Sequence, residues 1–236
     1  MYTAITGFAA AVCAAAVLFL LRERSALRRR LLDAEMRGLR TQLNPHFLYN
    51  TLNAISELGY DSPELADRMV TRLSGLLRKS LDESHRQEIA LRDEIDFLKR
   101  YLEIQQMLLR DRLSVTFAID ENTQCARVPG MILQPLVENG LTHGAGSDGV
   151  AHLDIRAKRE GTALIIAVED HGPGAEAHHV SPGGIGLSNI RARLHHLYGG
   201  AGGLELQART GGGLTAQLKI PFHEAFAYDE AARTDR

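Results

Sequence analysis

The sequence predicts an α+β fold in which an apolar N-terminal helix precedes a helical hairpin and a C-terminal α/β sandwich. Three observations support this order: an uncharged stretch over residues 1–21, leucines repeating at steps of three and four over residues 24–83, and short alternating apolar segments after residue 112. With 236 residues, 44% of them hydrophobic, the chain can form one large domain or two small ones. A net charge of −2 argues against direct nucleic-acid binding, and two distant cysteines argue against a disulfide framework.

The first 21 residues are expected to anchor the chain in a membrane. They contain no charged side chain, and as a helix they would span roughly 31 Å, close to a bilayer core of about 30 Å. Five arginines follow within residues 22–30 and are expected to hold that end in the cytoplasm. A cleaved signal peptide or a peripheral segment is the alternative, but a signal peptide carries its positive charge before the apolar stretch. We expect a single-pass protein of the inner or plasma membrane whose remaining chain is cytoplasmic.

Residues 22–84 are expected to form a dimerising helical hairpin. One long helix is predicted over residues 24–58, and Pro45 within it indicates a kink or a new helix start. The segment Gly59–Pro63 has turn chemistry, and a second helix is predicted from there to about Glu83. Because a single hairpin buries little surface, we expect two copies to pair as a four-helix bundle in a homodimer.

The chain beyond residue 84 is predicted to alternate helices and strands. A connecting helix is expected within residues 85–112, from Ile89 onward, and a charged tail over residues 223–236. Strands are predicted at 113–119, 152–158, 163–169, 204–208 and 215–220, and helices at 131–142 and 187–198. Strands covered by helices on one side would form an α/β sandwich over residues 113–222.

One histidine lies in a distinctive setting. Residues 43–50 read Leu-Asn-Pro-His-Phe-Leu-Tyr-Asn, so His46 follows a proline at the start of a helical pattern and Asn50 shares its helix face. An imidazole is partly neutral at pH 7, so one ring nitrogen can act as a nucleophile. Asn50 is the best local candidate to orient the ring or contact a phosphate, and Asn44 is another. A capping or core histidine is the alternative interpretation.

Two later blocks have the chemistry of a nucleotide pocket. On a predicted helix, Asn139 can coordinate Mg²⁺ directly, while Glu138 can hold or polarise a water. Asp170 ends a predicted strand, where its carboxylate can accept a hydrogen bond from the exocyclic amine of adenine. Gly172 and Gly174 are expected to turn the backbone with positive φ and approach a ligand closely. A solvated polar pair and a plain turn are the respective alternatives.

A glycine-rich segment follows and leads into a helix. Residues 183–187 read Gly-Gly-Ile-Gly-Leu, and free backbone N–H groups at a helix start favour phosphate oxygens. Glycines from residue 172 to residue 186 also suggest a flexible lid over the nucleotide. The segment is neither a Walker A loop nor a dinucleotide fingerprint. A reactive histidine followed by a nucleotide site suggests that ATP, with Mg²⁺ neutralising charge, phosphorylates the histidine.

Four segments resemble the motifs of the LytS-type sensor histidine kinases. Residues 42–53, Gln-Leu-Asn-Pro-His-Phe-Leu-Tyr-Asn-Thr-Leu-Asn, resemble the phosphoacceptor box of that family. Residues 133–140 resemble its N box, residues 168–174 its first glycine box and residues 184–191 its second. The resemblance covers residues 35–222 and implies a Bergerat-type (GHKL) ATP-binding domain, shared with gyrase and Hsp90 ATPases.

The resemblance implies a histidine kinase of a two-component system. It implies autophosphorylation of His46 in a homodimer and transfer to an aspartate of a response regulator, which in this family often carries a LytTR DNA-binding domain. By that match, Asn139 would hold Mg²⁺ and Asp170 would read adenine. The remaining residues expected to contact the nucleotide or shape the lid are His143, Gly172, Gly174, Gly184, Gly186 and Leu187, while His46, Asn50 and Glu138 are the expected catalytic residues.

Three features depart from the family pattern. Thr142 stands where the N box commonly has Lys or Arg, and His171 stands where the first glycine box usually has Asn. Both departures could lower ATP affinity or rate. The third is a single membrane span, which leaves the signal unexplained. Two alternative functions follow: a GHKL ATPase or serine kinase with the same pocket, and a degenerate kinase acting as a membrane-tethered dimerisation partner.

Overall fold

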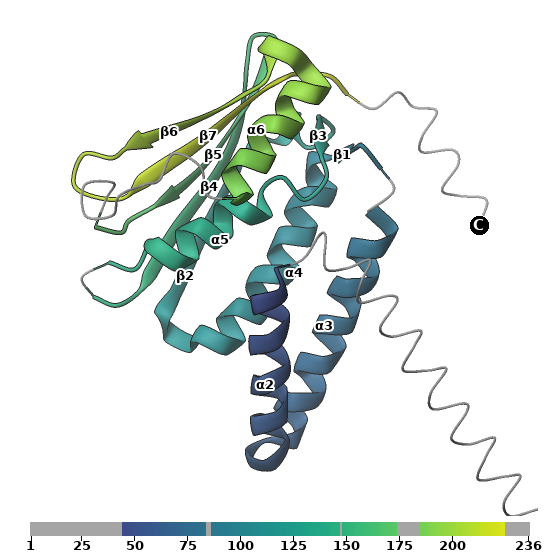
Figure 1. Cartoon of the computed structure of the whole chain (residues 1–236), viewed down its shortest axis with the longest axis vertical. Coiled ribbons are helices and arrows are strands. Elements are labelled where there is room, and N and C mark those ends of the chain that lie inside the picture. The colour runs from purple at the N-terminus through teal and green to yellow at the C-terminus, as the bar shows by residue number, and fades with distance from the viewer. Residues whose placement is uncertain (1–43, 84–85, 147, 174–184, 225–236) are drawn as a thin grey trace, which may run out of the picture. The chain divides into compact units, whose positions relative to one another are not determined.

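The computed structural model describes residues 44–83, 86–146, 148–173 and 185–224 (Figure 1). The chain divides into two compact units, Met1–Tyr49 and Asn50–Arg236. The predicted membrane anchor, the predicted helix before residue 44 and the end of the tail lie outside the described residues. Within the described ranges, none of the helices combines the length and apolar character needed to cross a bilayer.

Helices and strands alternate along the described chain after an initial helix pair. The helices are α2 (Pro45–Asp61), α3 (Pro63–Glu83), α4 (Leu91–Leu109), α5 (Gln134–His143) and α6 (Ile185–Tyr198), with short 3-10 turns η1 (Arg110–Arg112), η2 (Glu121–Thr123) and η3 (Gly199–Ala201). The strands are β1 (Glu88–Ala90), β2 (Leu113–Ile119), β3 (Arg127–Pro129), β4 (Ala151–Glu160), β5 (Ala163–Asp170), β6 (Gly203–Ala208) and β7 (Leu214–Pro221). The five predicted strands of the sandwich are therefore all present.

Pro45 starts a helix rather than kinking one, within the part of the chain that is described. It is the first residue of α2, and the Asn44 side-chain oxygen accepts the backbone N–H of His46 at 3.0 Å. Proline suits this position because the first N–H of a helix has no partner within the helix. Asn44 thus caps the helix. The Asn44 side-chain oxygen that forms this bond is the group predicted, as an alternative to Asn50, to orient the His46 ring.

The turn predicted between the first two helices is shorter than expected. Gly59 and Tyr60 continue α2 as far as Asp61, and Ser62 alone separates α2 from α3. The Ser62 N–H donates to the Leu58 carbonyl at 2.7 Å, so the helical hydrogen-bond pattern of α2 continues as far as Ser62. The loop predicted from these turn-forming residue types was therefore too long.

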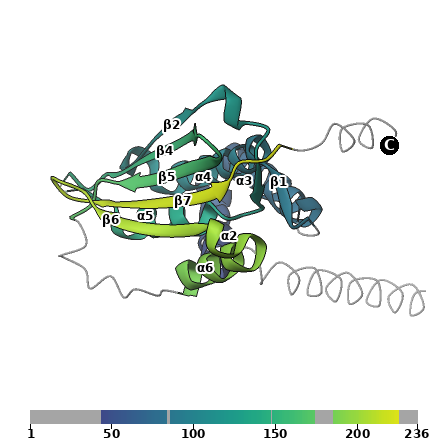
Figure 2. The ribbon, with the colours of Figure 1, turned by 90° about the horizontal axis from the view of Figure 1, so that it is seen from above.

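The main sheet has the strand order β2-β4-β5-β7-β6 (Figure 2). Strands β2 and β4 pair in parallel, and the other neighbours pair antiparallel. Burial alternates along β4, where Leu153, Ile155 and Ala157 are buried on the face that also carries Val168 of β5. This alternation of period two gives the sheet one apolar face, which needs covering.

Helices cover that apolar face. Helix α5 packs on β4 and β5, and α6 packs on β6 and β7, on the same side of the sheet (Figure 1). The core between the layers contains Leu133, Leu136, Val137, Leu153, Ile155, Ile166, Leu194 and Leu218, each no more than 2% exposed. The predicted α/β sandwich is therefore confirmed, and its helical layer places α5 over the ends of the central strands.

Two element boundaries were predicted wrongly. Ile89 belongs to strand β1, which pairs antiparallel with β3 opposite Val128, so α4 begins only at Leu91. The sequence of these three-residue strands has no pattern from which the β1–β3 sheet could have been predicted. The helix predicted from Met131 begins at Gln134, because Met131 has a left-handed backbone with φ of 59° that cannot continue a helix.

Candidate nucleotide-binding site

The start of α5 is held from two sides. Glu94 of α4 is 1% exposed; its Oε2 accepts the backbone N–H of Met131 at 2.6 Å and its Oε1 that of Leu133 at 2.9 Å. From α6, the Arg193 guanidinium donates to the Gly130 carbonyl at 2.5 Å. Charge-assisted bonds of this kind are stronger than neutral ones. The turn before α5 is therefore clamped, which fixes where the helix begins.

Glu138, in the middle of α5, is held by two hydrogen bonds to one oxygen. Its Oε1 accepts the Gln134 side-chain N–H at 2.9 Å and the Tyr101 hydroxyl at 3.3 Å. The Tyr101 oxygen in turn accepts the Gln105 amide at 2.8 Å. Burial, with the neighbouring Glu138 carboxylate adding to it, raises the pKa of the Tyr101 hydroxyl far above its usual range. Tyr101 therefore stays protonated and remains a donor to Glu138.

Asp170 lies at the end of β5, as predicted, with its carboxylate held by backbone groups. It is 6% exposed, and its Oδ1 accepts the N–H of Gly172 at 3.0 Å and that of Leu214 at 3.2 Å. Arg209 donates to the Asp170 carbonyl oxygen at 2.9 Å. Within the described ranges, Oδ2 accepts no hydrogen bond. An oriented, largely buried carboxylate with one such oxygen can accept a bond from an amine.

Small residues let α5 approach Asp170 closely. A Cβ on Gly140 would lie 2.6 Å from Leu153 Cδ2, and a Cβ on Gly144 would lie 2.7 Å from the Asp170 Cβ. A Cβ on Gly144 would also lie 2.3 Å from the Gly140 carbonyl oxygen, so glycine is required there, whereas a Cβ on Gly140 would force the Leu153 side chain to move. The C-terminal half of α5 and the end of β5 are thereby brought together, which unites the two predicted blocks in one place.

Gly172 is needed for a different reason from the one predicted. The expectation of positive φ at this residue is wrong, since its backbone is not left-handed. A Cβ here would instead lie 2.3 Å from the His143 carbonyl oxygen at the end of α5. Close approach of two backbones, rather than turn geometry, therefore requires glycine. Gly174 and Gly184 lie outside the described residues.

The other predicted site residues are distributed over α5 and α6. Asn139 is half-buried beside Glu138, and His143 is exposed at the last residue of α5. In the first turn of α6, Leu187 is 7% exposed, and a Cβ on Gly186 would lie 3.4 Å from Pro135, so the starts of the two helices are neighbours. One amide oxygen with waters and phosphate oxygens is a normal ligand set for Mg²⁺, and the described residues contain no cluster of three or more acidic, His or Cys ligands.

The two departures from the family motifs each have a hydrogen-bond partner other than Asp170. The Thr142 hydroxyl donates to the Glu138 carbonyl within its own helix at 2.8 Å. His171 bonds through Nε2 to Asp154 at 2.9 Å. On β4, Asp154 follows Leu153, which pairs with Asp170, so the Asp154 side chain lies on the other face of the sheet from the buried Leu153. Whether either residue lowers ATP affinity stays a prediction, but His171 has a structural partner of its own.

Several residues that shape the site were missed by the sequence interpretation. They are Glu94, Tyr101, Gln105, Gln134 and Arg193. A spacing of four places Tyr101 with Gln105, and Gln134 with Glu138, on common helix faces, and that signal was available. Nothing local shows that these two helix faces meet, because the contact between them joins Tyr101 and Glu138, which are 37 positions apart.

His46 and Asn50 lie on α2 and are both exposed, as predicted for a reactive histidine. Exposure matters because a phosphoryl acceptor must be reachable by its donor. A core histidine, the alternative considered from the sequence, does not fit this exposure.

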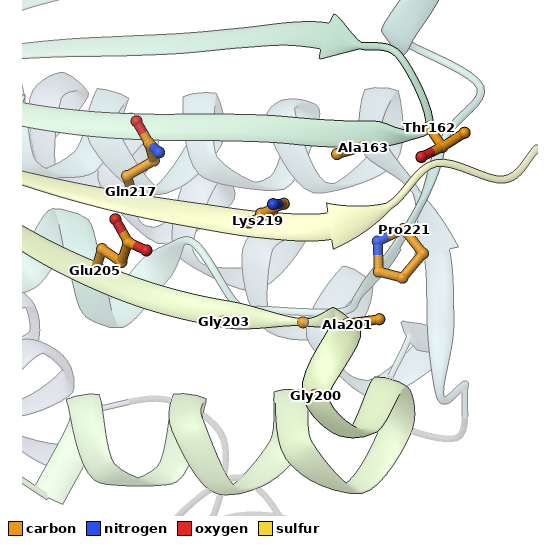
Figure 3. Close-up of a pocket in the computed structure, with 10 residues that line it drawn as sticks. Thr162, Ala163, Gly200, Ala201, Gly203, Glu205, Gln217, Lys219 and Pro221 are labelled. Carbon is orange, nitrogen blue, oxygen red and sulfur yellow. The ribbon is translucent and has the colours of Figure 1, made fainter.

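The structure also has a hollow of about 450 Å³ away from Glu138 and Asp170 (Figure 3). Its lining residues on the strands, among them Glu205, Gln217 and Lys219, alternate with the buried Leu204 and Leu218, so they face away from the helical layer. Figure 3 shows these side chains along the strands, with Gly200 and Ala201 of η3 at one end of the hollow. This hollow is therefore distinct from the predicted nucleotide site.

Strands β4 to β7 of the sheet and the helices α5 and α6 that cover them lie within the match to a known class of ATPase domain. A family model described as histidine kinase-, DNA gyrase B- and HSP90-like ATPase matches residues 127–224, and this match implies ATP binding. A second model, described as histidine kinase, matches residues 34–113. The two matches together reach from the segment before His46 to the end of the sheet.

Similar proteins refine this class. Sensor histidine kinase YpdA of Escherichia coli K12 is 35% identical over 175 residues, which are 70% of this chain and 31% of that protein. Sensor protein LytS of Staphylococcus epidermidis is 32% identical over 202 residues, which are 80% of this chain and 34% of that protein. A solved histidine kinase domain of the blue-light activated kinase from Erythrobacter litoralis has a TM-score of 0.49 at 19% identity, covering 82% of this chain and 94% of that one.

The chain belongs to the LytS-type histidine kinase family. It spans about a third of the length of the curated relatives that it matches.

Proposed function

We propose that this chain is a sensor histidine kinase that transfers the γ-phosphoryl group of ATP to His46 and then to an aspartate of a response regulator. The observation that carries the proposal is the exposed imidazole at the capped first turn of α2, inside the segment that the histidine kinase model matches. The second support is the oriented Asp170 carboxylate inside the segment that the ATPase model matches.

The residues around Asp170 fit a bound Mg²⁺·ATP. The Asp170 Oδ2 would accept a hydrogen bond from the adenine amine, and Asn139 would hold Mg²⁺, which neutralises phosphate charge when bound. The start of α6, with Gly186 and Leu187, would offer backbone N–H groups to phosphate oxygens. The remaining residues proposed to contact the nucleotide or form its lid are His143, Gly172, Gly174 and Gly184.

The chemical step is a displacement at phosphorus. One His46 ring nitrogen forms the new N–P bond as the bond between the γ-phosphorus and the bridging oxygen breaks, and ADP leaves with that electron pair. The proton on the phosphorylated imidazole passes to Glu138, directly or through a water that Glu138 polarises. Asn50, one turn after His46, would orient the ring. Transfer to the regulator reverses the roles, because an aspartate oxygen then attacks the phosphorus and the imidazole leaves.

The proposed partners follow from the same interpretation. Apolar side chains on α2 and α3 are exposed within the described residues, including Leu52 at 46%, Tyr60 at 89% and Val70 at 44%, and pairing with a second copy would cover them. We therefore propose a homodimer whose response regulator is of the LytTR type. The uncharged N-terminal stretch supports a single-pass anchor in the inner or plasma membrane with the kinase in the cytoplasm.

The test is labelling of the purified full chain with γ-labelled ATP and Mg²⁺. Wild type should incorporate label that is acid-labile and base-stable, as expected for phosphohistidine. His46→Gln should incorporate none while its ATP affinity changes less than about twofold. His195→Gln, which changes another exposed helical histidine, is the matched control and should label normally.

Other outcomes would support the alternative functions. Persistent labelling of His46→Gln would refute the assignment, and acid-stable label would favour a serine kinase. ATP hydrolysis without label would indicate an ATPase, and ATP binding without either activity would indicate a degenerate kinase. Adding the regulator encoded nearest to this chain should move the label to an acid- and base-labile acyl phosphate.

A further inference from the structure

We propose that Tyr101 is a positioning residue for phosphoryl transfer, which acts by holding the Glu138 carboxylate in one orientation together with Gln134. The inference rests on the proposed function, because it assumes that Glu138 handles the proton of His46. Tyr101 lies on α4 and is 1% exposed, and it reaches Glu138 of α5 across 37 positions of sequence.

The hydrogen bonds in this cluster can run in only one direction. The Gln105 amide NH₂ can only donate, so the Tyr101 oxygen accepts from it and the single Tyr101 proton is left to donate to Glu138 Oε1. Gln105 sits one turn further along α4 than Tyr101. Gln134 must likewise turn its NH₂ group toward Glu138. Two donors on one oxygen fix the plane of the carboxylate, and hence the direction in which its second oxygen faces.

The scaffold of the cluster is stiff. Helix α4 makes two contacts of this kind. Glu94 binds the backbone N–H groups of Met131 and Leu133, and Tyr101, seven residues later, binds Glu138, which is seven residues after Met131. A spacing of seven is about two helical turns, so both contacts lie on the same face of α4. Helix α4 is thus bonded both to the turn before α5, through Glu94, and to α5 itself, through Tyr101. The position of Glu138 along α5 and the direction of its side chain therefore depend on α4 as well as on α5.

The Gln134 side chain supports a role of the arrangement in orienting the carboxylate. Turning its NH₂ toward Glu138 leaves its Oε1 buried, and this oxygen has no hydrogen-bond partner among the described residues. Unsatisfied buried acceptors are uncommon in native structures and destabilising, and a catalytic role is one explanation for them. An apolar residue of the same size would avoid this penalty at a purely structural position.

The test compares Tyr101→Phe with Tyr198→Phe in the full chain. Each substitution removes only a hydroxyl that donates to a carboxylate, Glu138 in the first case and Glu88 in the second. Tyr101→Phe should lower the rate constant of His46 labelling at saturating ATP about tenfold, while the KM for ATP and the melting temperature change little. Tyr198→Phe should keep the wild-type rate constant.

A double variant separates positioning from an independent effect. If Tyr101 acts through Glu138, adding Tyr101→Phe to Glu138→Gln should cause no further loss of rate. The inference is overturned if wild type is labelled and Tyr101→Phe matches it, or if the two losses multiply. It is also overturned if the rate falls only in proportion to ATP affinity or folded fraction. Absence of label in wild type would instead overturn the proposed function, and this inference with it.

Discussion

Glu94 and Met131 are joined by a hydrogen bond of 2.6 Å between the buried carboxylate and the Met131 backbone N–H. The bond holds Met131 in a left-handed conformation with φ of 59°, which residues other than glycine rarely adopt. The other carboxylate oxygen binds Leu133. The start of the helix that carries Glu138 and Asn139 therefore depends on an acidic residue of α4.

Replacement of Glu94 by Gln should destabilise the fold. Glutamine keeps one acceptor but turns an NH₂ group toward a backbone N–H, so one buried donor loses its partner. We expect a loss of about 2–3 kcal/mol in the free energy of unfolding, measured by urea denaturation. Glu103→Gln is the control, because that carboxylate is half exposed and pairs with Arg72 at the surface, and it should cost less than about 0.5 kcal/mol. Equal effects of the two variants would contradict the role of Glu94.

Alanine at Gly140 and at Gly75 should change stability in opposite directions. Both glycines lie inside helices, where alanine is intrinsically better by about 1 kcal/mol. A Cβ at Gly75 meets nothing within 4 Å, whereas one at Gly140 would lie 2.6 Å from Leu153. Thermal unfolding should therefore show Gly75→Ala slightly stabilised and Gly140→Ala destabilised by about 1–3 kcal/mol. A stabilised Gly140→Ala would mean that the contact between α5 and β4 is looser than described.

Asp170→Asn should separate nucleotide binding from folding. Asparagine can still accept the Gly172 and Leu214 N–H groups through one oxygen, but it places a donor where Asp170 has Oδ2. We expect the folded state to be retained and ATP affinity to fall roughly 10- to 100-fold, as for a lost bond to a charged group. Isothermal titration calorimetry with ATP and Mg²⁺ measures this. If Asp170→Asn and Asn139→Ala both bound ATP normally, the proposed pocket would be wrong.

Asp154 should contribute to stability in a pH-dependent manner. A hydrogen bond from Thr116 is the main cause that holds the pKa of Asp154 below its usual range; burial opposes the shift, and His171 and Arg156 add to it. A carboxyl group whose pKa is lowered by folding stabilises above its unfolded pKa of about 3.9, and that contribution is lost as the pH falls toward the folded value.

Asp154→Asn should therefore be less stable than wild type at pH 7 by about 1 kcal/mol, and this difference should shrink toward pH 3. Urea unfolding at both pH values measures the change, and Asp67→Asn, at an exposed position on α3, is the control. A difference that stays constant with pH would show that ionisation of Asp154 contributes nothing.

The sequence predicted those features of the site that are local. Asp170 ends a strand and Glu138 lies within a helix because the periodicity and the residue types around them are sufficient to indicate it. Pro45 indicated either a kink or a new helix start, and it is the first residue of α2. The same reasoning extended α5 back to Met131, since an apolar residue fits a helical pattern. The contacts of distant Glu94 and Arg193 with residues 130–133 are not visible in that pattern.

What the sequence could not predict depends on contacts between distant segments. Tyr101 and Glu138 are 37 positions apart, and Arg193 and Gly130 are 63 apart. Periodicity assigns a face to each helix without saying which faces meet. Gly172 shows the same limit, because its motif suggested a turn conformation while the requirement is space for the His143 carbonyl.

The pairing of β1 with β3 determines where a chimaera of this protein could be joined. Ile89 of β1 and Val128 of β3 are almost fully buried, and α4 follows β1 without a break. A junction at residue 113, at the predicted domain border, would leave behind the aromatic and aliphatic side chains that α4 packs inward, along with Glu94 and Tyr101. A nucleotide-binding domain transferred to another kinase would thus keep its core intact only if the transferred segment began before Glu88.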